Sequence, residues 1–291
     1  MANAVRNYKD SLFTHLFGHD PRLLVELYNA ISGTDYPPDT PVEITTLEGV
    51  LYAGLKNDIS FQLDGRYVVL AEHQSTINEN MPIRLLLYAA RVYEQILSSD
   101  NLYRRRLVKL PAPEFVVLYN GEEPFPREKL YRLSDAYLAQ PGENTLELKV
   151  RVININAEQD SPVLRRSETL AGYSSFVQAV REHQEAGLSL NEAIQKSIHQ
   201  CIDQGILREF LEKNGSEVRN MVLTEWDENE ARRIAAEEAR EEAREEAREE
   251  TLKKSQKEVA IKLLRKGMPI SEIGEVVELS EEQIEKLRKE I

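Results

Sequence analysis

The run Phe115–Tyr119 (FVVLY) constrains the fold most, because five consecutive residues are apolar and Asn120-Gly121 closes the run. A strand without a polar position is typical of one buried on both faces. Alternating patterns at residues 42–53, 58–63, 67–74 and 146–155 indicate further strands. Helical patterns are expected at residues 12–17 and 82–98, and from Pro21 to Gly33. We therefore expect an α/β fold, a mixed sheet flanked by helices.

Two of these strands are predicted to form a hairpin. Asp64-Gly65 separates residues 58–63 from 67–74, and Asp-Gly is a strong signal for a tight hairpin turn. A loop centred there pairs residues whose numbers sum to 129 or 130. Asp58 and Glu72 then become cross-strand neighbours, with Cβ atoms ~4.5–5.5 Å apart. Gln74 shares the face of Glu72, and His73 points to the opposite face.

Two carboxylates at one sheet end repel each other unless a cation lies between them. Oxygen ligands suit a hard ion such as Mg²⁺, which binds through one or two carboxylates, waters and substrate phosphate. The alternative is that Asp58 and Glu72 are two exposed strand-end carboxylates of an acidic protein. Spacing alone leaves both interpretations open.

Composition excludes several classes of protein. A single cysteine, Cys201, rules out an internal disulfide framework and any multi-cysteine zinc site. No segment is apolar enough to span a membrane, and we expect a cytoplasmic protein. The net charge of −13 argues against broad electrostatic binding to nucleic acid. The sequence still contains a local basic cluster, Arg104-Arg105-Arg106 with Lys109. This cluster either contacts a DNA backbone or belongs to a solvated loop.

The chain is expected to have four parts: a core over residues 1–156, a helical extension over 157–226, a charged helical spacer over 227–252 and a small helical tail over 253–291. In the extension, helices at 163–185 and 190–212 would end at Gly187 and Gly215. The spacer contains three Glu-Glu-Ala-Arg repeats, which favour a solvated helix over a coiled-coil seam. The tail fits a mini-bundle for packing or oligomerisation, or a DNA-reading helix-turn-helix.

Residues 71–95 (AEHQSTINENMPIRLLLYAARVYEQ) carry a family resemblance. Asp58 followed by Glu72-His73-Gln74 resembles the signature of PD-(D/E)XK nucleases, an Asp on one strand and Glu-x-Lys on the next. The longer segment is similar to the recombination-promoting nuclease and putative transposase family. The opening YKDSLF at residues 8–13 and the strand FVVLYNG resemble it too. The resemblance covers residues 8–156 well and extends loosely over the helices to about residue 226 and the helical tail.

The resemblance implies a divalent-metal-dependent DNA endonuclease linked to recombination or transposition. Asp58 and Glu72 would hold one or two ions, Mg²⁺ or another divalent cation such as Mn²⁺ or Ca²⁺, with the backbone carbonyl of His73 as a further ligand. Catalytic roles would fall to Asp58, Glu72 and Gln74. The partner would be DNA, and cutting both strands would favour a homodimer.

One position departs from the superfamily, since Gln74 stands where Lys is usual. Neutral Gln orients by hydrogen bonds but supplies no positive charge. Lys56 and Arg84 are candidate replacements for that charge. Arg84 and Tyr88, one helical turn apart, are expected to face the same cleft and contact phosphate. Glu26 is a candidate additional metal-site acid.

A second hypothesis stays open beside the nuclease. The core would be a catalytically weak or inactive module that binds DNA or protein, with the helical tail as an oligomerising element. Gln74 and the acidic net charge favour it. Metal titration separates the two hypotheses, because an inactive core should show no Asp58-dependent stabilisation by divalent ions.

Overall fold

The protein is described from a computed structural model, which covers residues 12–46, 58–97, 103, 105–159, 161–277 and 279–289; for parts of the C-terminal helices it describes the backbone alone. The chain divides into two compact units, Met1–Trp226 and Asp227–Ile291. The first unit holds the sheet and most helices, and the second holds the end of one long helix and two short ones.

The first unit is built on a six-stranded mixed sheet in the order β1-β2-β3-β4-β6-β5. Parallel pairing joins β3 to β4 and β4 to β6, and the other neighbours are antiparallel. The strands are β1 (Val42–Ile44), β2 (Ile59–Leu63), β3 (Tyr67–Gln74), β4 (Ala112–Tyr119), β5 (Glu128–Arg132) and β6 (Lys149–Asn154). The α/β class with a mixed sheet is confirmed. Within the strand expected over 42–53, β1 ends at Ile44, and residues 47–53 lie outside the described residues.

The hairpin register follows the turn. Asp64 and Gly65 have φ of 52° and 61°, and the Arg66 N–H donates to the Leu63 carbonyl at 3.0 Å, which is a type I′ turn. Ile59 pairs with Ala71 and Leu63 with Tyr67, so paired residue numbers sum to 130. The predicted register is confirmed. Asp58 therefore directly precedes β2, opposite the end of β3.

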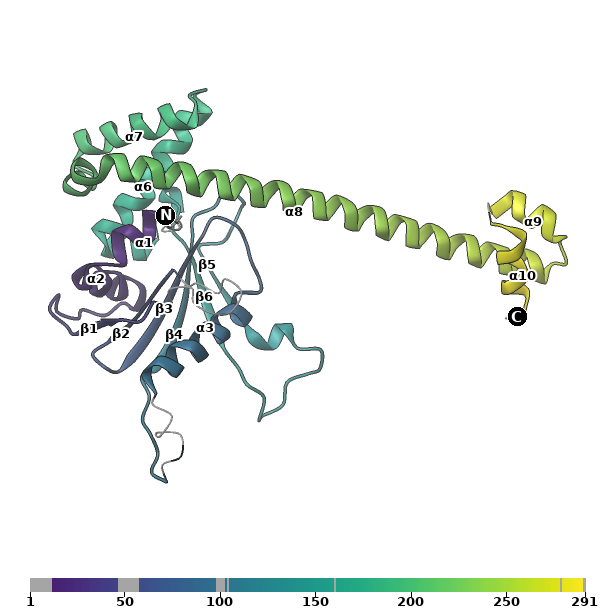
Figure 1. The fold of residues 1–291 in the computed structure, drawn as a ribbon, viewed down its shortest axis with the longest axis horizontal. Helices are drawn as coiled ribbons and strands as arrows, with labels where there is room; N and C mark the ends of the chain where they lie inside the picture. The colour runs from purple at the N-terminus through teal and green to yellow at the C-terminus, as the bar shows by residue number, and fades with distance from the viewer. Residues whose placement is uncertain are drawn as a thin grey trace, which may run out of the picture. The chain divides into compact units, whose positions relative to one another are not determined.

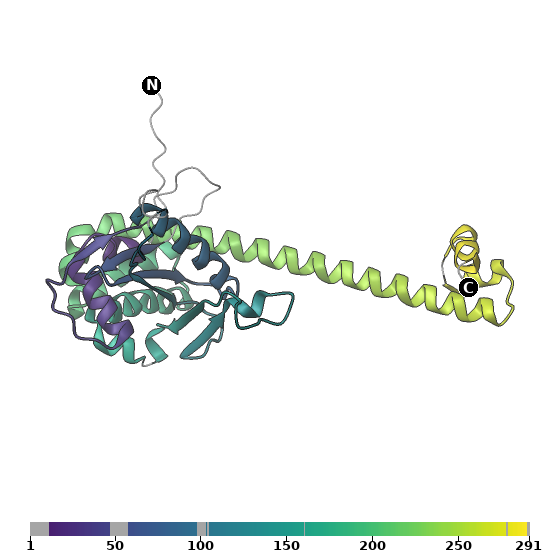
Figure 2. The same ribbon diagram turned by 90° about the horizontal axis from the view of Figure 1, so that it is seen from below.

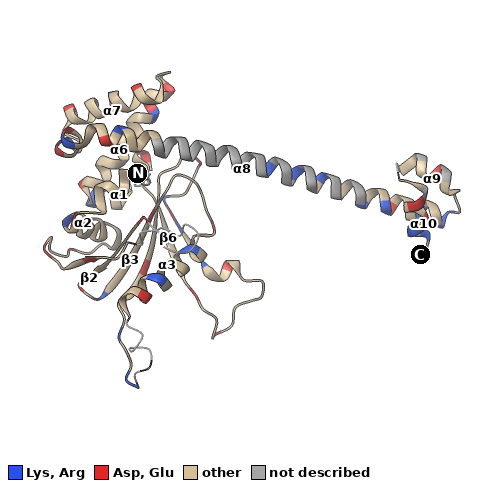
Figure 3. Cartoon of the chain, viewed as in Figure 1, with Lys and Arg blue, Asp and Glu red and all other residues tan. Residues whose placement is uncertain are grey.

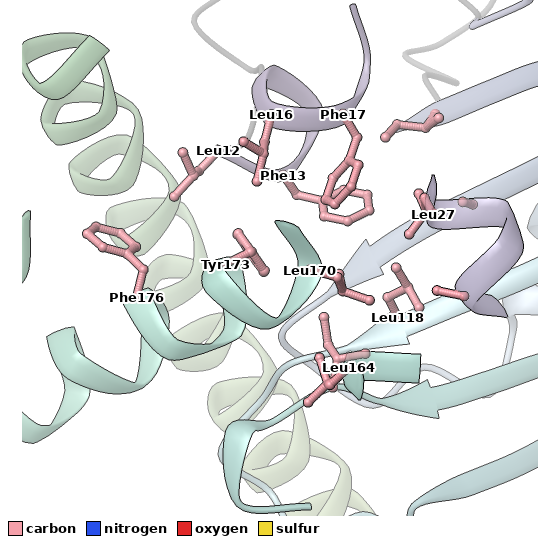
Figure 4. Packing of buried hydrophobic residues seen from close by; sticks show 14 of the residues in the cluster. Leu12, Phe13, Leu16, Phe17, Leu27, Leu118, Leu164, Leu170, Tyr173 and Phe176 are labelled. Carbon is pink, nitrogen blue, oxygen red and sulfur yellow. The ribbon is translucent and has the colours of Figure 1, made fainter. Parts of the chain in front are cut away.

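Two hydrophobic clusters cover the two faces of the sheet, and Figure 1 shows the sheet and the helices of this unit. The larger lies under α1 (Leu12–Phe17), α2 (Pro21–Ser32), α5 (Pro162–Arg166), α6 (Glu168–Glu185), α7 (Leu190–Gln204) and the start of α8 (Arg208–Arg265). Figure 4 shows the aromatic and leucine side chains of α1 meeting those of α6 within it. On β4, Leu118 belongs to this cluster and Tyr119 to the other, so the strand is buried on both faces as predicted.

A single helix, α3 (Met81–Ile96), crosses the second face and connects the parallel strands β3 and β4. Figure 2 shows the sheet between this helix and the helices of the opposite face. The helix was expected. Its apolar spacing predicts a buried stripe of Leu86, Ala89, Ala90, Tyr93 and Leu97, and the observed stripe is rotated from this one. The buried residues are Met81, Pro82, Leu85, Tyr88, Ala89 and Val92. Because Leu86 and Leu87 are apolar too, composition alone did not define the face.

In the helical extension, α6 ends at Glu185 just before Gly187 and α7 begins at Leu190, as expected, but other breaks differ from those expected. Ser167 ends α5 and caps α6, accepting a hydrogen bond from the Leu170 N–H at 2.9 Å. After α7 the chain turns at Gly205 (φ 78°), and Gly215 lies inside α8 instead of ending a helix. A Cβ at Gly215 would meet its nearest atom, a side-chain carbon of Ile198, at 3.8 Å, which is an ordinary van der Waals contact, so packing does not require glycine there.

In the second unit, the end of α8, α9 (Ile270–Val277) and α10 (Glu281–Lys289) form one small core. Its buried residues are Ala260, Ile273, Val277, Ile284 and Leu287. Ser280 and Gln283 exchange hydrogen bonds in a capping box. Val276, although apolar and next to Val277, is 62% exposed.

Among the described Asp, Glu, Lys and Arg residues, Glu72 alone is buried, and Figure 3 marks where charged residues occur along the ribbon. No helix of the described part of the chain is both long and apolar enough to cross a membrane.

Candidate functional site

The candidate site lies at the end of the β2–β3 hairpin farthest from the turn, where Asp58 and Glu72 are linked through backbone groups. The Asp58 N–H donates to Glu72 Oε1 at 3.1 Å. The His73 N–H donates to Asp58 Oδ2 at 2.8 Å. Each acidic residue is therefore held by the strand of the other, because the antiparallel register brings the start of β2 to the end of β3.

Glu72 is the most buried acid of the site. Its side chain is 3% exposed, whereas Asp58 is half-buried. Burial, and next the nearby Asp58, raise the pKa of Glu72 to about 8, while Arg84 and the Asp58 N–H act in the opposite direction. Buried carboxylates are kept in proteins where they are paired or bind a cation. The same burial means that solvent reaches Asp58 more readily than Glu72.

Arg84 and Tyr88 complete one side of this site from α3. Arg84 Nη2 lies 3.2 Å from Glu72 Oε2 and donates to the Tyr88 hydroxyl at 3.0 Å. The (i, i+4) spacing puts both residues on one face of the helix. The structure thus brings the two residues together with Glu72, as the sequence predicted, while their contact with phosphate stays a prediction.

Gln74 lies on the same face of β3 as Glu72, two residues further along. Its Nε2 contacts Met81 Sδ at 2.8 Å, and Met81 Sδ is also 3.5 Å from Arg84 Nη1. The amide is thus engaged with the first residue of α3. A thioether is a weak acceptor, so this contact holds Gln74 loosely.

His73 points to the opposite face of the sheet, as expected from strand alternation. Its ring stacks on Phe13 with centroids 5.3 Å apart, and Nε2 lies 2.9 Å from the Tyr173 hydroxyl. Burial, and then the positive charge of Arg181, lower the pKa of His73 to about 4, so the imidazole is neutral at pH 7. The ring anchors the end of β3 to α1 and α6. Ligation by the His73 carbonyl remains a prediction.

Glu26 does not join the carboxylate pair, and that expectation is wrong. Its carboxylate accepts hydrogen bonds from Ser167 Oγ at 2.6 Å and from the Thr169 N–H and hydroxyl, both at 3.1 Å. It therefore stabilises the N-terminus of α6, on the face of the sheet opposite Glu72. A pocket of about 460 Å³ between α2 and the loop after it also includes Glu26 and Arg166, but neither Asp58 nor Glu72.

We expect Glu26→Ala to lower the free energy of unfolding by about 1–3 kcal/mol, because three donors at the start of α6 lose their acceptor. Binding of Mn²⁺ should be unchanged. Urea denaturation and calorimetric titration measure the two quantities. Glu26→Gln, which keeps one acceptor oxygen, should be less destabilising. Loss of Mn²⁺ binding in a folded Glu26→Ala protein would show that Glu26 contributes to metal binding after all.

Sequence reasoning missed a buried polar network at the ends of β4 and β6. Arg181 of α6 donates to Asn156 Oδ1 at 2.9 Å and to the Asn120 carbonyl at 2.7 Å, and Asn156 Nδ2 donates to the Gly121 carbonyl at 2.9 Å. Asparagines directly after two predicted strands were the available signal. Arg181, which ties them to α6, carried no signal because its contacts are all distant in sequence.

The remaining basic residues of interest are Lys56 and the cluster at residues 104–109. Lys56 lies outside the described residues, as does Arg104. Arg105, Arg106 and Lys109 are exposed in the loop after α3, and Figure 3 shows basic residues at the tip of that loop. Among the described residues, no hydrogen bond or ion pair joins Arg105, Arg106 or Lys109 to Glu72.

The donor set fits some metal ions and not others. Within the described ranges, no three His, Cys, Asp or Glu side chains converge as a metal-binding group. The pair of Asp58 and Glu72 offers oxygen ligands only, which suits Mg²⁺ or Mn²⁺ completed by water and phosphate oxygens. It does not suit the tetrahedral nitrogen and sulfur coordination of structural zinc.

Comparison with known proteins identifies no relative. No protein-family model matches the chain, and neither a curated protein nor a solved structure matches it.

The raised pKa of Glu72 has a consequence for stability in the absence of metal. Between pH 4.5 and about 8 the unfolded chain releases this proton while the folded protein keeps it, so stability falls as pH rises. Glu72→Gln removes this dependence. Relative to wild type, we expect the variant to gain on the order of 3 kcal/mol between pH 5 and pH 8.5.

Urea denaturation in EDTA at several pH values measures this difference. Glu143→Gln, in an exposed loop, is the matched control and should follow the wild-type pH profile. Parallel profiles for Glu72→Gln and wild type would show that the pKa of Glu72 is ordinary.

Proposed function

We propose that this protein is a divalent-metal-dependent DNA endonuclease with a PD-(D/E)XK core, similar to the recombination-promoting nucleases. The observation that carries the proposal is the interlocked pair of Asp58 and Glu72 at the end of β2 and β3, joined by hydrogen bonds of 3.1 and 2.8 Å. The mixed sheet and the family-like segment at residues 71–95 are compatible with it. An arginine beside the pair suits a phosphate-containing substrate.

Asp58 and Glu72 would hold the ion, which when bound supplies charge stabilisation at the phosphoryl oxygens and an activated water. Asp58 is the more accessible of the two ligands, since it is half-buried. Glu72 is fixed by its hydrogen bond to the Asp58 N–H, which limits the geometries it can present. Arg84 would contact a phosphate oxygen, because a guanidinium donates two parallel hydrogen bonds.

Gln74 would orient water or phosphate through its amide in place of the usual lysine. Its contact with Met81 is weak enough to be exchanged for a stronger acceptor. The positive charge that lysine supplies elsewhere would come from Arg84, whose Nη2 lies 3.2 Å from Glu72. DNA and a second copy of the chain are the proposed partners, since two active sites cut two strands.

The direct test is cleavage of supercoiled plasmid by purified protein. Nicked or linear DNA should appear with Mg²⁺ or Mn²⁺ and not with EDTA. If neither Mg²⁺ nor Mn²⁺ supports cleavage, the proposed activity is contradicted.

A second candidate is a module of the same fold that binds DNA or protein without cutting. The burial of Glu72, with its side chain 3% exposed beside Arg84, favours this alternative. Binding of a labelled DNA duplex without cleavage, and unaffected by Asp58→Asn, would support it. The second unit would then serve as an oligomerising element.

A further inference from the structure

Arg84 lies on the solvent side of Glu72. The side chain of Arg84 is 36% exposed and that of Glu72 is 3% exposed, and Arg84 Nη2 lies 3.2 Å from Glu72 Oε2. The same nitrogen donates to the Tyr88 hydroxyl at 3.0 Å, and Nη1 is 3.5 Å from Met81 Sδ. Apart from Glu72, the contacts that hold this guanidinium are therefore a neutral phenol and a weakly accepting thioether.

Both carboxylate oxygens of Glu72 are engaged. Oε1 accepts the Asp58 N–H at 3.1 Å, and Oε2 contacts Arg84. A carboxylate oxygen has two lone pairs, so the bond to the backbone can persist when a cation binds. The guanidinium is different, because it carries a charge of the same sign as the incoming ion within a few ångströms.

We propose that Arg84 is an internal counter-ion of Glu72 that leaves this carboxylate when a divalent cation binds, and then contacts the phosphate backbone of the polynucleotide. The proposal rests on the proposed function and deepens it, since it makes cation binding and phosphate binding depend on one side chain. The partial exposure of Arg84 allows its side chain to turn outward without unfolding α3.

Charge balance determines the direction of the effect. If Glu72 is ionised, a divalent ion adds two positive charges beside Arg84. If Glu72 is protonated, the ion replaces one proton and still adds one positive charge. In both cases the repulsion with Arg84 weakens cation binding, so removing the guanidinium should strengthen it.

The first experiment measures Mn²⁺ affinity by calorimetric titration of the full chain. Arg84→Met should bind Mn²⁺ at least about tenfold more tightly than wild type. Arg91→Met is the matched control, because it removes the same charge from the same helix at a residue paired with the exposed Glu94. We expect less than about a twofold change in that variant, since exposed charges are screened.

A second variant guards against misfolding of the first. Arg84→Lys keeps the positive charge and should keep the affinity of wild type for Mn²⁺ within about twofold. Far-ultraviolet circular dichroism of all variants checks that they remain folded. If wild type binds Mn²⁺ and folded Arg84→Met binds it equally well or more weakly, this inference is wrong but the proposed function stands. If neither protein binds Mn²⁺, both this inference and the proposed function fail.

The second experiment measures affinity for a labelled DNA duplex by fluorescence anisotropy in saturating Ca²⁺. Arg84→Met should bind roughly tenfold more weakly, because a charge-assisted contact to phosphate is lost. The slope of log affinity against log salt concentration should become shallower by about one, which corresponds to the loss of one phosphate contact. A general loosening of the site would weaken the binding of both Mn²⁺ and DNA. Opposite changes in Mn²⁺ and DNA affinity therefore support the proposed exchange, and changes of the same sign overturn it.

Discussion

Replacing either Asp58 or Glu72 by alanine should reduce metal-dependent plasmid cleavage at least about a thousandfold, because each would supply one of the two carboxylate ligands that we propose from the described residues. The loss should not require unfolding. Asp58→Asn is the sharper variant, since its side-chain oxygen can still accept the His73 N–H that Asp58 accepts at 2.8 Å. Initial rates of plasmid nicking in Mg²⁺ and in Mn²⁺ measure the effect.

Glu143→Ala is the control for this experiment, because it removes one negative charge from an exposed loop. It should cleave at the wild-type rate. The Asp58 and Glu72 variants should also lose Mn²⁺ binding in a titration. Cleavage at the wild-type rate by folded Asp58→Asn and Glu72→Ala proteins would refute the assignment of the site.

Gly121→Ala should be the most destabilising small substitution near the site. A Cβ there would lie 2.1 Å from the Ser75 carbonyl oxygen and 2.4 Å from the Tyr119 hydroxyl. The oxygen belongs to the backbone just beyond β3, so relief of the overlap must move the end of that strand. We expect the free energy of unfolding to fall by about 3 kcal/mol or more.

Urea denaturation of Gly121→Ala and Gly142→Ala tests this prediction. At Gly142 a Cβ would meet its nearest atom, Thr145 Oγ1, at 3.9 Å, so that variant should stay within about 0.5 kcal/mol of wild type. Because the movement would reach Gln74, Gly121→Ala should also impair DNA cleavage. Equal stability of the two variants would show that the chain relaxes around Gly121 without strain.

Much of the site could be predicted from the sequence because it is local. Asp64-Gly65 defines the turn, the turn defines the register, and the register brings Asp58 opposite Glu72. The same alternation places His73 on the other face. Arg84 and Tyr88 share a helix face through their spacing alone. These predictions needed no contact between segments distant in sequence.

The wrong predictions concern choices that local patterns leave open. The helix over 81–96 has apolar residues on more than one face, and packing on the sheet selected Leu85 and Val92 instead of Ala90. Strand β5 was missed because it is a largely exposed edge strand, in which Tyr131 alone is buried. An edge strand is defined by the partner it pairs with, and its own sequence carries little signal.

Glu26 shows the same limit for a charged residue. A half-buried glutamate on a helix can bind a metal or cap another helix, and its sequence context is identical in both cases. The distant Ser167 and Thr169 decided its role.

The amino-acid sequence by itself determined the class of fold, the hairpin register and the meeting of two acidic residues, because each follows from neighbours within about twenty positions. The tertiary structure alone decided how deeply Glu72 is buried, how closely the guanidinium of Arg84 approaches it and which residues anchor the strand ends. Those properties depend on segments up to about a hundred residues apart, such as Tyr173 against His73, and burial and electrostatics act through space rather than along the chain.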